Sequence, residues 1–154
     1  MEYLGNFLNQ DAYWLEFRLF REETFPNEHW TCVIYANNFV GTDYFNHFTK
    51  KCVENHATSI IITGRYAYEF LEKTYPLESQ TDLFDHTFEV GKTEFVLNME
   101  TFSESCYSSF FHNNNPLDPN WENQLVFTDI YYPNRVKSLK KLIREFNSVS
   151  DGPD

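Results

Sequence analysis

Hydrophobic residues gather in four short, continuous runs that recur about every thirty residues. The runs are Cys32–Tyr35, Ile60–Ile62, Phe95–Leu97 and Leu125–Phe127. Continuous rather than alternating runs are typical of strands that are buried on both faces of a parallel sheet. A helical pattern follows each run, which is the rhythm of repeated strand–helix units. We therefore predict one α/β domain over residues 1–154, a three-layer sandwich with a mainly parallel sheet of four to six strands and helices on both faces.

Apolar residues spaced by three and four mark helices between the runs. The first helix follows Thr42 or Asp43, either of which can cap it, and the second follows Gly64. The third begins at Thr101–Glu104, which has the T-x-x-E spacing of a capping box. The last helix starts near Asn134 and has an inward apolar stripe. That stripe consists of Val136, Leu139, Ile143 and Phe146.

The ends of the chain are less regular. Residues 1–25 form an N-terminal extension in which WLEFRLF alternates apolar and charged residues, a pattern that predicts a half-exposed edge strand. The stretch HTFEVGKTEFVL predicts a short extra strand before Gly91. Asn and Pro in HNNNPLDPN predict a loop, and residues 148–154 are predicted to be a disordered tail.

Aromatic residues make up 19% of the chain, whereas its hydrophobic and charged contents are near the globular norm. A domain of this length buries roughly 70% of the surface of its unfolded chain, so many of these rings must fill the core. The alternative is that some of the Tyr and Phe side chains form an exposed contact surface.

The formal net charge of −11 excludes a general nucleic-acid binder, because neutralising phosphates requires clustered Lys and Arg. The charge is uneven: residues 66–134 are strongly acidic, whereas residues 135–144 are basic. This asymmetry predicts either a solvated acidic face beside a solvated basic helix, or an acidic surface that meets a basic partner. The basic residues of the second segment are Arg135, Lys137, Lys140, Lys141 and Arg144.

Cellular location is predicted from cysteines and hydropathy. The three cysteines form no C-x-x-C pair, and each lies in an apolar run, where Cys usually behaves as a small hydrophobe. No charged-then-apolar leader opens the chain, and no apolar run approaches the roughly 18 residues that span a bilayer. We expect a reduced, soluble, cytoplasmic protein without membrane or nucleic-acid partners.

The turn after Ile62 resembles the start of a nucleotide-binding loop, because a strand runs into Gly64 and then a helix. A dinucleotide fingerprint needs further glycines, but the bulky Arg65 and Tyr66 follow here. We therefore expect Gly64 to reverse the chain tightly. The stretch VGKTEF mimics the end of a phosphate-binding Walker motif, but the glycine five residues earlier is replaced by His86.

Histidines and cysteines offer weaker candidates for chemistry. His47 and His56 each begin a His-x-Thr element, as in two-histidine phosphodiesterases, but they lie only nine residues apart. Cys106 or Cys32 paired with one of three histidines would give a nucleophile and a base, but no spacing joins them. The histidines are His56, His86 and His112. No zinc-ligand spacing is present, and we expect neither a metal nor a cofactor.

Polar residues that follow the four predicted strands form the candidate site, because ligands of open α/β sheets bind beyond the carboxyl ends of the strands. Arg65 could bind an anion at a helix N-terminus or pair with a carboxylate such as Glu100, and we favour the pair. Glu100 and Asp129 could act as acid and base or hold a divalent ion. The alternative is that these residues cap helices and solvate loops. The candidates are Asn38, Thr63, Arg65, Glu100, Ser103 and Asp129.

One resemblance supports the fold. The order of the CVIY strand, a helix, SIIITG with an aromatic-rich helix, and FVLNMETFSESCYSSFF resembles an uncharacterised bacterial family of small, Rossmann-like α/β domains. The chain has the acidic cap Glu104 and the closing aromatics Phe110 and Phe111 of that family. It lacks the family's Trp-His pair after the strand. The resemblance covers roughly residues 25–130 and implies the fold without an activity.

Two functions remain open. The first is a non-enzymatic interaction protein of the inhibitor, immunity or regulatory-subunit type, whose acidic and aromatic surface docks on a protein with a basic surface. The aromatic excess also makes a homodimer an option. The second is a small-ligand-binding or hydrolytic domain that works at the carboxyl edge of the sheet.

Overall fold

The computed structural model describes most of the chain. The described residues are 1–38, 40–74, 87–90, 92–112, 115, 117 and 121–150. The strands are β1 (Glu2–Phe7), β2 (Gln10–Trp14), β3 (Trp30–Tyr35), β4 (Ser59–Thr63), β5 (Thr87–Val90), β6 (Thr93–Asn98) and β7 (Gln124–Asp129). The helices are α1 (Thr42–Glu54), α2 (Ala67–Thr74), α3 (Phe102–Ser109) and α4 (Val136–Ser150), with a 3-10 helix η1 (Phe17–Glu22).

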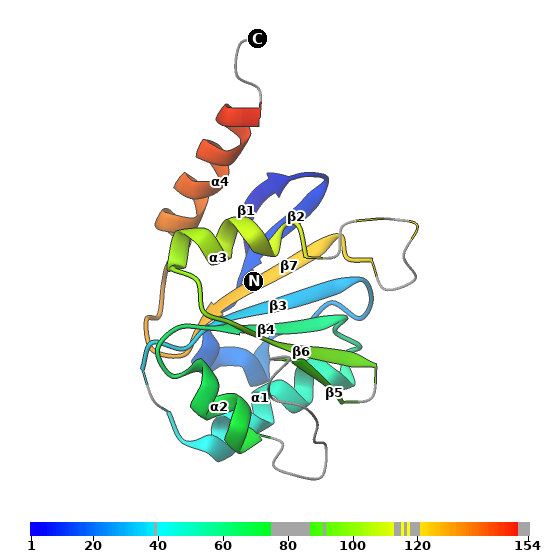
Figure 1. Cartoon of the computed structure of the whole chain (residues 1–154), viewed down its shortest axis with the longest axis vertical. Coiled ribbons are helices and arrows are strands. Elements are labelled where there is room, and N and C mark those ends of the chain that lie inside the picture. The colour runs from blue at the N-terminus through cyan, green and yellow to red at the C-terminus, as the bar shows by residue number, and fades with distance from the viewer. Residues whose placement is uncertain are drawn as a thin grey trace.

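The strands form one seven-stranded mixed sheet in the order β1-β2-β7-β3-β4-β6-β5 (Figure 1). The strands from β2 to β6 in this order are parallel, whereas β1 and β5 pair antiparallel at the two edges. The predicted sandwich with four to six mainly parallel strands is therefore wrong in strand number and in the character of the sheet edges. The four hydrophobic runs form β3, β4, β6 and β7, and the extra strand predicted before residue 91 is β5.

The β1–β2 hairpin was not expected, because its turn lacks the usual sequence signal. Phe7 pairs with Gln10, so the turn consists of Leu8 and Asn9 alone. Both turn residues have positive φ, 56° and 63°. Such a two-residue turn normally contains Asn-Gly or Asp-Gly. A leucine in its first position does not predict a turn.

The predicted edge strand WLEFRLF is wrong. Trp14 ends β2, and η1 begins at Phe17. Leu15, Phe17 and Phe20 are buried, whereas Leu19 is exposed. The buried positions thus follow a helical step of three along Phe17 and Phe20, and the alternation up to Leu19 was accidental.

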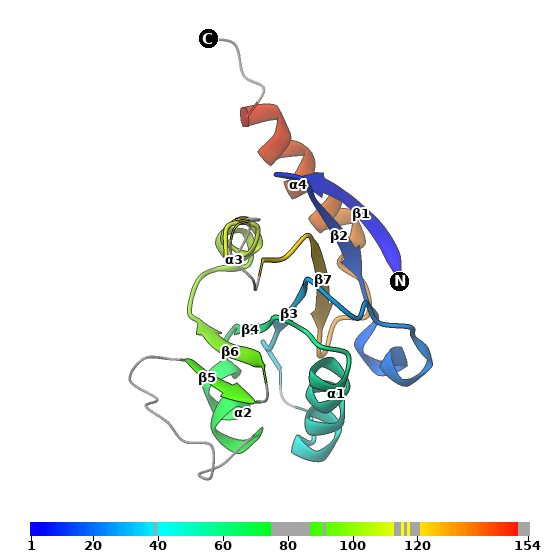
Figure 2. The same cartoon turned by 90° about the vertical axis from the view of Figure 1, so that its right-hand side faces the viewer.

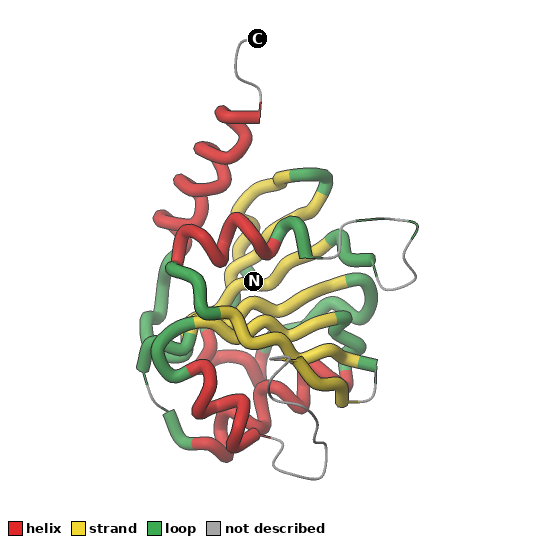
Figure 3. Tube along the Cα trace, in the orientation of Figure 1, coloured by secondary structure: helices red, strands yellow, loops and turns green. Residues whose placement is uncertain are grey.

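Helices cover both faces of the sheet (Figures 2 and 3). Alternate residues of the central strands enter two different cores. Ile34 and Ile62 point to the face that α1, α2 and η1 cover. Val33 and Ile61 point to the face that α3 and α4 cover. This two-sided burial explains why the strands appear as continuous apolar runs.

Two helix starts agree with the sequence. Thr101 Oγ1 accepts the backbone N–H of Glu104 at 3.3 Å, and the Glu104 carboxylate accepts the Thr101 hydroxyl at 2.7 Å. The capping box is therefore confirmed, although Glu104 bonds the hydroxyl rather than the backbone of Thr101. Asn134 Oδ1 accepts the N–H of Val136 at 2.8 Å and caps α4.

α4 extends beyond the sheet and packs against β1 (Figure 1). Gly5 permits this contact, since a Cβ there would lie 3.1 Å from Ile143 Cγ2. α4 continues to Ser150, three residues into the predicted tail 148–154, and residues 151–154 lie outside the described part. Within the described residues, none of the helices has the length and apolar content that crossing a bilayer requires.

Candidate functional site

The winding of the sheet reverses between β3 and β7. β3 continues through α1 to β4 on one side, whereas β7 lies on the other side of β3 and is reached from β6 through α3. α1 and α3 cover opposite faces of the sheet (Figure 2). Ligands of open α/β sheets bind at such a reversal, at the carboxyl ends of the strands. Tyr35 and Asp129, the last residues of β3 and β7, are paired there.

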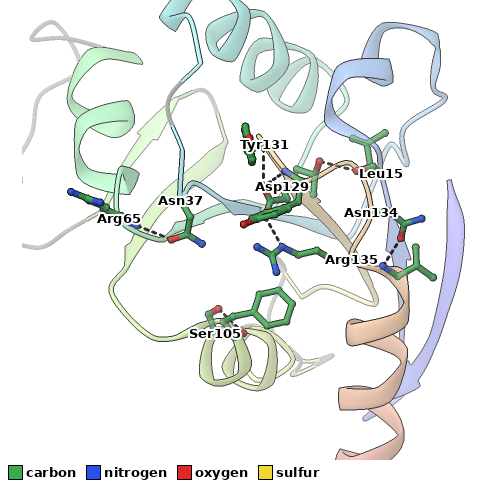
Figure 4. Close-up of polar contacts among 12 residues, drawn as sticks. Leu15, Asn37, Arg65, Ser105, Asp129, Tyr131, Asn134 and Arg135 are labelled. Carbon is green, nitrogen blue, oxygen red and sulfur yellow. Dashed lines mark hydrogen bonds and ion pairs between the residues drawn. The ribbon is translucent and has the colours of Figure 1, made fainter.

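Asp129 is a fully buried carboxylate that the chain itself satisfies (Figure 4). Its Oδ1 accepts the backbone N–H groups of Tyr131 at 2.8 Å and Tyr132 at 2.9 Å. Its Oδ2 accepts Arg135 Nε at 2.5 Å. Both oxygens are thus engaged in shaping the β7–α4 connection.

Arg135 is the residue that the sequence analysis missed, because we grouped it with the basic face of the last helix. It immediately precedes α4, where the helix dipole disfavours a cation. The Asp129 carboxylate offsets this cost, and two aromatic rings flank the guanidinium. Arg135 Cζ lies 4.5 Å from the ring centroid of Tyr132 and 4.7 Å from that of Phe102. Its side chain is 21% exposed. The only sequence signal was its place in a short strand–helix connection, six residues after Asp129.

Arg65 lies at the start of α2 with an exposed side chain. Its backbone N–H donates to Asn37 Oδ1 at 3.1 Å (Figure 4), and its guanidinium lies 5.5 Å from the ring of Tyr66. The N–H groups of Tyr66 and Ala67 donate to backbone carbonyls at 2.8 and 3.1 Å. The amides that open α2 therefore bond to the chain rather than point at an anion.

Gly64 turns the chain where β4 meets β3. Its φ is +110°, and a Cβ there would lie 2.8 Å from Asn37 Oδ1 and 2.9 Å from the carbonyl carbon of Ala36. Only glycine combines this φ with such close backbone approach. The predicted role of Gly64 as a tight reversal is confirmed.

Glu100 and Thr63 are the two predicted site residues that come into contact. The Thr63 hydroxyl donates to the Glu100 carbonyl at 3.3 Å, and the exposed Glu100 carboxylate accepts the Ser108 hydroxyl at 2.8 Å. Over the described residues, no ion pair joins Glu100 to Arg65. The pair at this edge is Asp129 with Arg135 instead.

The remaining predicted residues stand apart. Ser103 is exposed in the first turn of α3, and Asn38 is half-buried in the β3–α1 connection. Three of the six predicted polar residues, Thr63, Glu100 and Asp129, thus use their side chains to hold loops and helix ends, as in the structural alternative that the sequence left open.

Aromatic side chains cluster where the β1–β2 hairpin meets α3 and α4. We call Tyr107, Phe111 and Phe146, gathered around the buried Phe7, the aromatic patch. The ring of Tyr107 lies 4.9 Å from that of Phe111 and 5.0 Å from that of Phe146, and the rings of Phe7 and Phe146 are 5.5 Å apart. Tyr107 and Phe111 are each 46% exposed. The patch is thus a continuation of the core to the surface.

Two exposed apolar residues lie close to the aromatic patch along the chain. Leu8, which follows Phe7 in the hairpin turn, and Val149, nearly one turn after Phe146 on α4, are exposed at 39% and 82%. By helical periodicity, the exposed basic residues of α4 lie on the side opposite Phe146. They are Lys137, Lys141 and Arg144.

A second polar cluster lies at the opposite end of the strands. His112 Nε2 lies 3.2 Å from Glu94 Oε1 and 3.2 Å from Ser59 Oγ. The hydrogen bond to Glu94 raises the pKa of His112 and lowers that of Glu94, and burial opposes both shifts. Nearby, the Thr31 hydroxyl donates to the buried Glu122 carboxylate. Because Ser59 and Glu94 share one imidazole nitrogen, His112 cannot relay a proton between them as in a Ser–His–acid triad.

Among the described residues, the cysteine and histidine pairs considered from the sequence do not assemble into a site, and His86 lies outside the described part of the chain. Cys32, Cys52 and Cys106 are completely buried. His47 is an exposed residue of α1, and His56 occupies the turn after that helix with φ 60°. In the part of the chain that the structure describes, no group of three or more His, Cys, Asp or Glu side chains is placed to hold a metal.

No protein-family model, no curated protein and no solved structure matches the chain. The resemblance to a bacterial Rossmann-like family therefore stays a prediction.

Proposed function

We propose that the chain is a non-enzymatic protein-interaction module that contacts its partner through the aromatic patch. The observation that carries the proposal is the half-exposure of Tyr107 and Phe111 within a cluster of touching rings. Tyr and Phe are enriched in the buried centre of protein interfaces, where large rigid rings lose little conformational entropy. Removing the exposed halves of these two rings from water would contribute about 1.5–3 kcal/mol to binding, since fully burying one ring contributes about that much and each is 46% exposed.

The expected partner presents a basic surface. The net charge of −11 attracts a basic protein at long range and accelerates its association at low salt. The basic face of α4 points away from the aromatic patch, so it does not oppose this approach. An inhibitor, an immunity protein or a regulatory subunit would have these properties.

The aromatic patch is best tested by capture from the source cells with matched baits. Three immobilised baits are compared: the wild type, the patch variant Tyr107→Ser/Phe111→Ser, and the control variant Leu19→Ser/Tyr68→Ser. Leu19 and Tyr68 are similarly exposed, at 39% and 45%, but belong to η1 and α2 on the other face of the sheet. We expect one stoichiometric partner with the wild type and the control, lost from the patch variant and weakened by salt.

Two results would reject this proposal. One is equal capture by the patch variant, which would place the contact elsewhere. The other is the absence of any partner at low salt. If purified wild type sediments as a dimer and the patch variant as a monomer, the partner is a second copy of the chain.

The alternative is a ligand-binding or hydrolytic domain at the carboxyl edge of the sheet. The observation in its favour is that Arg65 is exposed just after the carboxyl end of β4 and, within the described residues, forms no ion pair. Against it, Asp129 is bonded to Arg135 and two backbone amides, and the first amides of α2 are bonded within the chain. A ligand that raises the melting temperature of the wild type but not of Arg65→Gln would support it.

A further inference from the structure

A basic hollow lies between η1 and the C-terminal half of α1, away from the aromatic patch. It has a volume of about 400 Å³ and opens to solvent. Its three cationic side chains and one carboxylate give a net charge of +2 when the histidine is neutral, in a chain whose net charge is −11. The lining residues are Arg21, His47, Lys50, Lys51, Glu54 and Asn55.

Lys51 clamps the two walls of the hollow together. Its Nζ donates to the backbone carbonyls of Phe20 and Glu23, each at 2.7 Å, and lies 4.5 Å from the ring centroid of Phe25. Since lysine donates three hydrogen bonds, the two carbonyls leave one N–H for a further acceptor. These contacts of Lys51 fix the end of η1 against α1 and thereby place Arg21 in the lining of the hollow.

Arg21 and His47 lie side by side in the wall. Arg21 Nη2 is 3.4 Å from His47 Nδ1. Because arginine has only donors, this contact is a hydrogen bond in the His47 tautomer that has its proton on Nε2 and leaves Nδ1 to accept. The guanidinium is also held by rings, with its Cζ 5.3 Å from Phe20 and 5.1 Å from Tyr44.

The positive charge of the hollow is only weakly compensated. Lys50 and Glu54 approach to 4.0 Å, and both side chains are more than 60% exposed, so this pair contributes little. Elsewhere in the described part of the chain, no carboxylate lies within ion-pair distance of Arg21 or Lys51. The hollow thus offers several donors to an anion that the protein does not supply.

We propose that the basic hollow binds the phosphate group of a small molecule. A phosphate has enough oxygens to accept the planar Arg21 fork, the Lys50 ammonium and the His47 Nε2–H together, whereas a carboxylate has only two. The volume falls within the range of about 300–1,000 Å³ for small-molecule sites, which leaves room for an attached sugar-sized group. The acidic remainder of the protein repels extended polyanions, so the ligand is a compact phosphate ester.

The direct test is a titration of the isotope-labelled full chain with inorganic phosphate, followed by NMR. We expect saturable shifts of the His47 imidazole and of the amides of Lys50 and Lys51, with chloride at equal ionic strength giving none. Arg21→Gln and Lys50→Gln should each weaken binding at least 10-fold. Arg18→Gln is the matched control, because Arg18 is an exposed arginine of the same 3-10 helix outside the hollow.

A second arm identifies the source of the phosphate. Ribose 5-phosphate should bind more tightly than inorganic phosphate because it fills more of the hollow. Tighter binding of a phosphoserine peptide would overturn the assignment to a small molecule. Non-saturable shifts, or an equal loss of binding in Arg18→Gln, would overturn the site itself. The result is independent of the aromatic patch, whose variants leave the hollow intact.

Discussion

Arg135 Nε donates to Asp129 Oδ2 across 2.5 Å, and this ion pair joins the end of β7 to the start of α4 at the winding reversal of the sheet. The Asp129 side chain is fully buried and also accepts two backbone N–H groups. The pair therefore holds a buried negative charge that no other described cation neutralises.

Removing Arg135 should be costly, because it leaves the Asp129 carboxylate buried without its cation. We expect Arg135→Gln to lower the free energy of unfolding by about 3 kcal/mol, measured by urea denaturation. The double variant Asp129→Asn/Arg135→Gln should lose less than the sum of the single variants. Arg65→Gln is the control at the same edge and should change stability by less than about 0.5 kcal/mol. Additive single effects would contradict the coupling.

The His112–Glu94 pair predicts a pH-dependent stability. Its hydrogen bond raises the pKa of His112 above 6.5 and lowers that of Glu94 below 4.5. The contribution of this pair to folding stability is thus present between pH 4.5 and pH 6.5. It is lost as pH rises through the raised pKa of His112, and as pH falls through the lowered pKa of Glu94.

The corresponding measurement compares unfolding of the wild type and His112→Gln across pH. The difference in free energy should be largest near about pH 5.5 and should shrink toward both pH extremes. His56→Asn alters an exposed histidine with positive φ, a conformation that asparagine tolerates, and should show no such maximum. A difference that grows toward alkaline pH would have the wrong sign.

Gly64→Ala should destabilise the fold by about 1–3 kcal/mol. The added Cβ would require positive φ and would meet the backbone of Ala36 and the Asn37 side chain. Gly41→Ala is the matched control, since nothing lies within 4 Å of its Cβ position and its φ is −56°. Thermal unfolding of both variants should show a loss for Gly64→Ala several times that for Gly41→Ala.

The Tyr35 hydroxyl is buried and, among the described residues, has no hydrogen-bond partner of good geometry. Burial raises the pKa of Tyr35 well above its ordinary value, and the nearby Cys106 adds to the shift. We expect Tyr35→Phe to leave stability unchanged or to raise it by about 1 kcal/mol, because an unsatisfied buried hydroxyl costs free energy. A loss in urea denaturation would mean that the hydroxyl bonds in solution, with Ser105 or Cys106 as the neighbour.

The three buried thiols should resist modification in the native protein. Burial raises the pKa of Cys106 to about 12 and that of Cys52 well above its ordinary value. The thiolate fraction of Cys106 at neutral pH is then lowered about 1,000-fold relative to an exposed cysteine. A thiol-reactive chromophore should label all three cysteines in guanidinium and essentially none in the native state. Rapid native labelling would show that the core opens.

The sequence predicted the interior of the fold better than its edges. The continuous apolar runs correspond to β3, β4, β6 and β7. A strand that is buried on both faces has apolar residues at successive positions, so it can be recognised without knowing which strands lie beside it. The β1–β2 hairpin was not predicted because Leu8–Asn9 lacks the sequence signal of a two-residue turn. η1 was not predicted because its apolar and charged residues alternate as they do in an edge strand. Among the predicted site residues, Thr63 ends β4 and Asp129 ends β7, so both lie at the carboxyl edge of the parallel strands, whereas a ligand site at that edge stays a prediction.

Local periodicity and capping thus determined four central strands, the start of α3 at Thr101 and the buried stripe of α4. The tertiary structure alone decided which side chains meet. Strand order set β7 beside β3, so Tyr35 lies beside Asp129, and the β7–α4 connection turns back to bring Arg135 to the Asp129 carboxylate. The packing of η1 on α1 likewise placed Arg21 and Lys50, which are twenty-nine residues apart in the sequence, in the lining of one basic hollow. The physical reason is that the burial of an element determines the pattern of apolar residues along its own sequence. Contacts between charged side chains depend instead on how the elements are arranged in space.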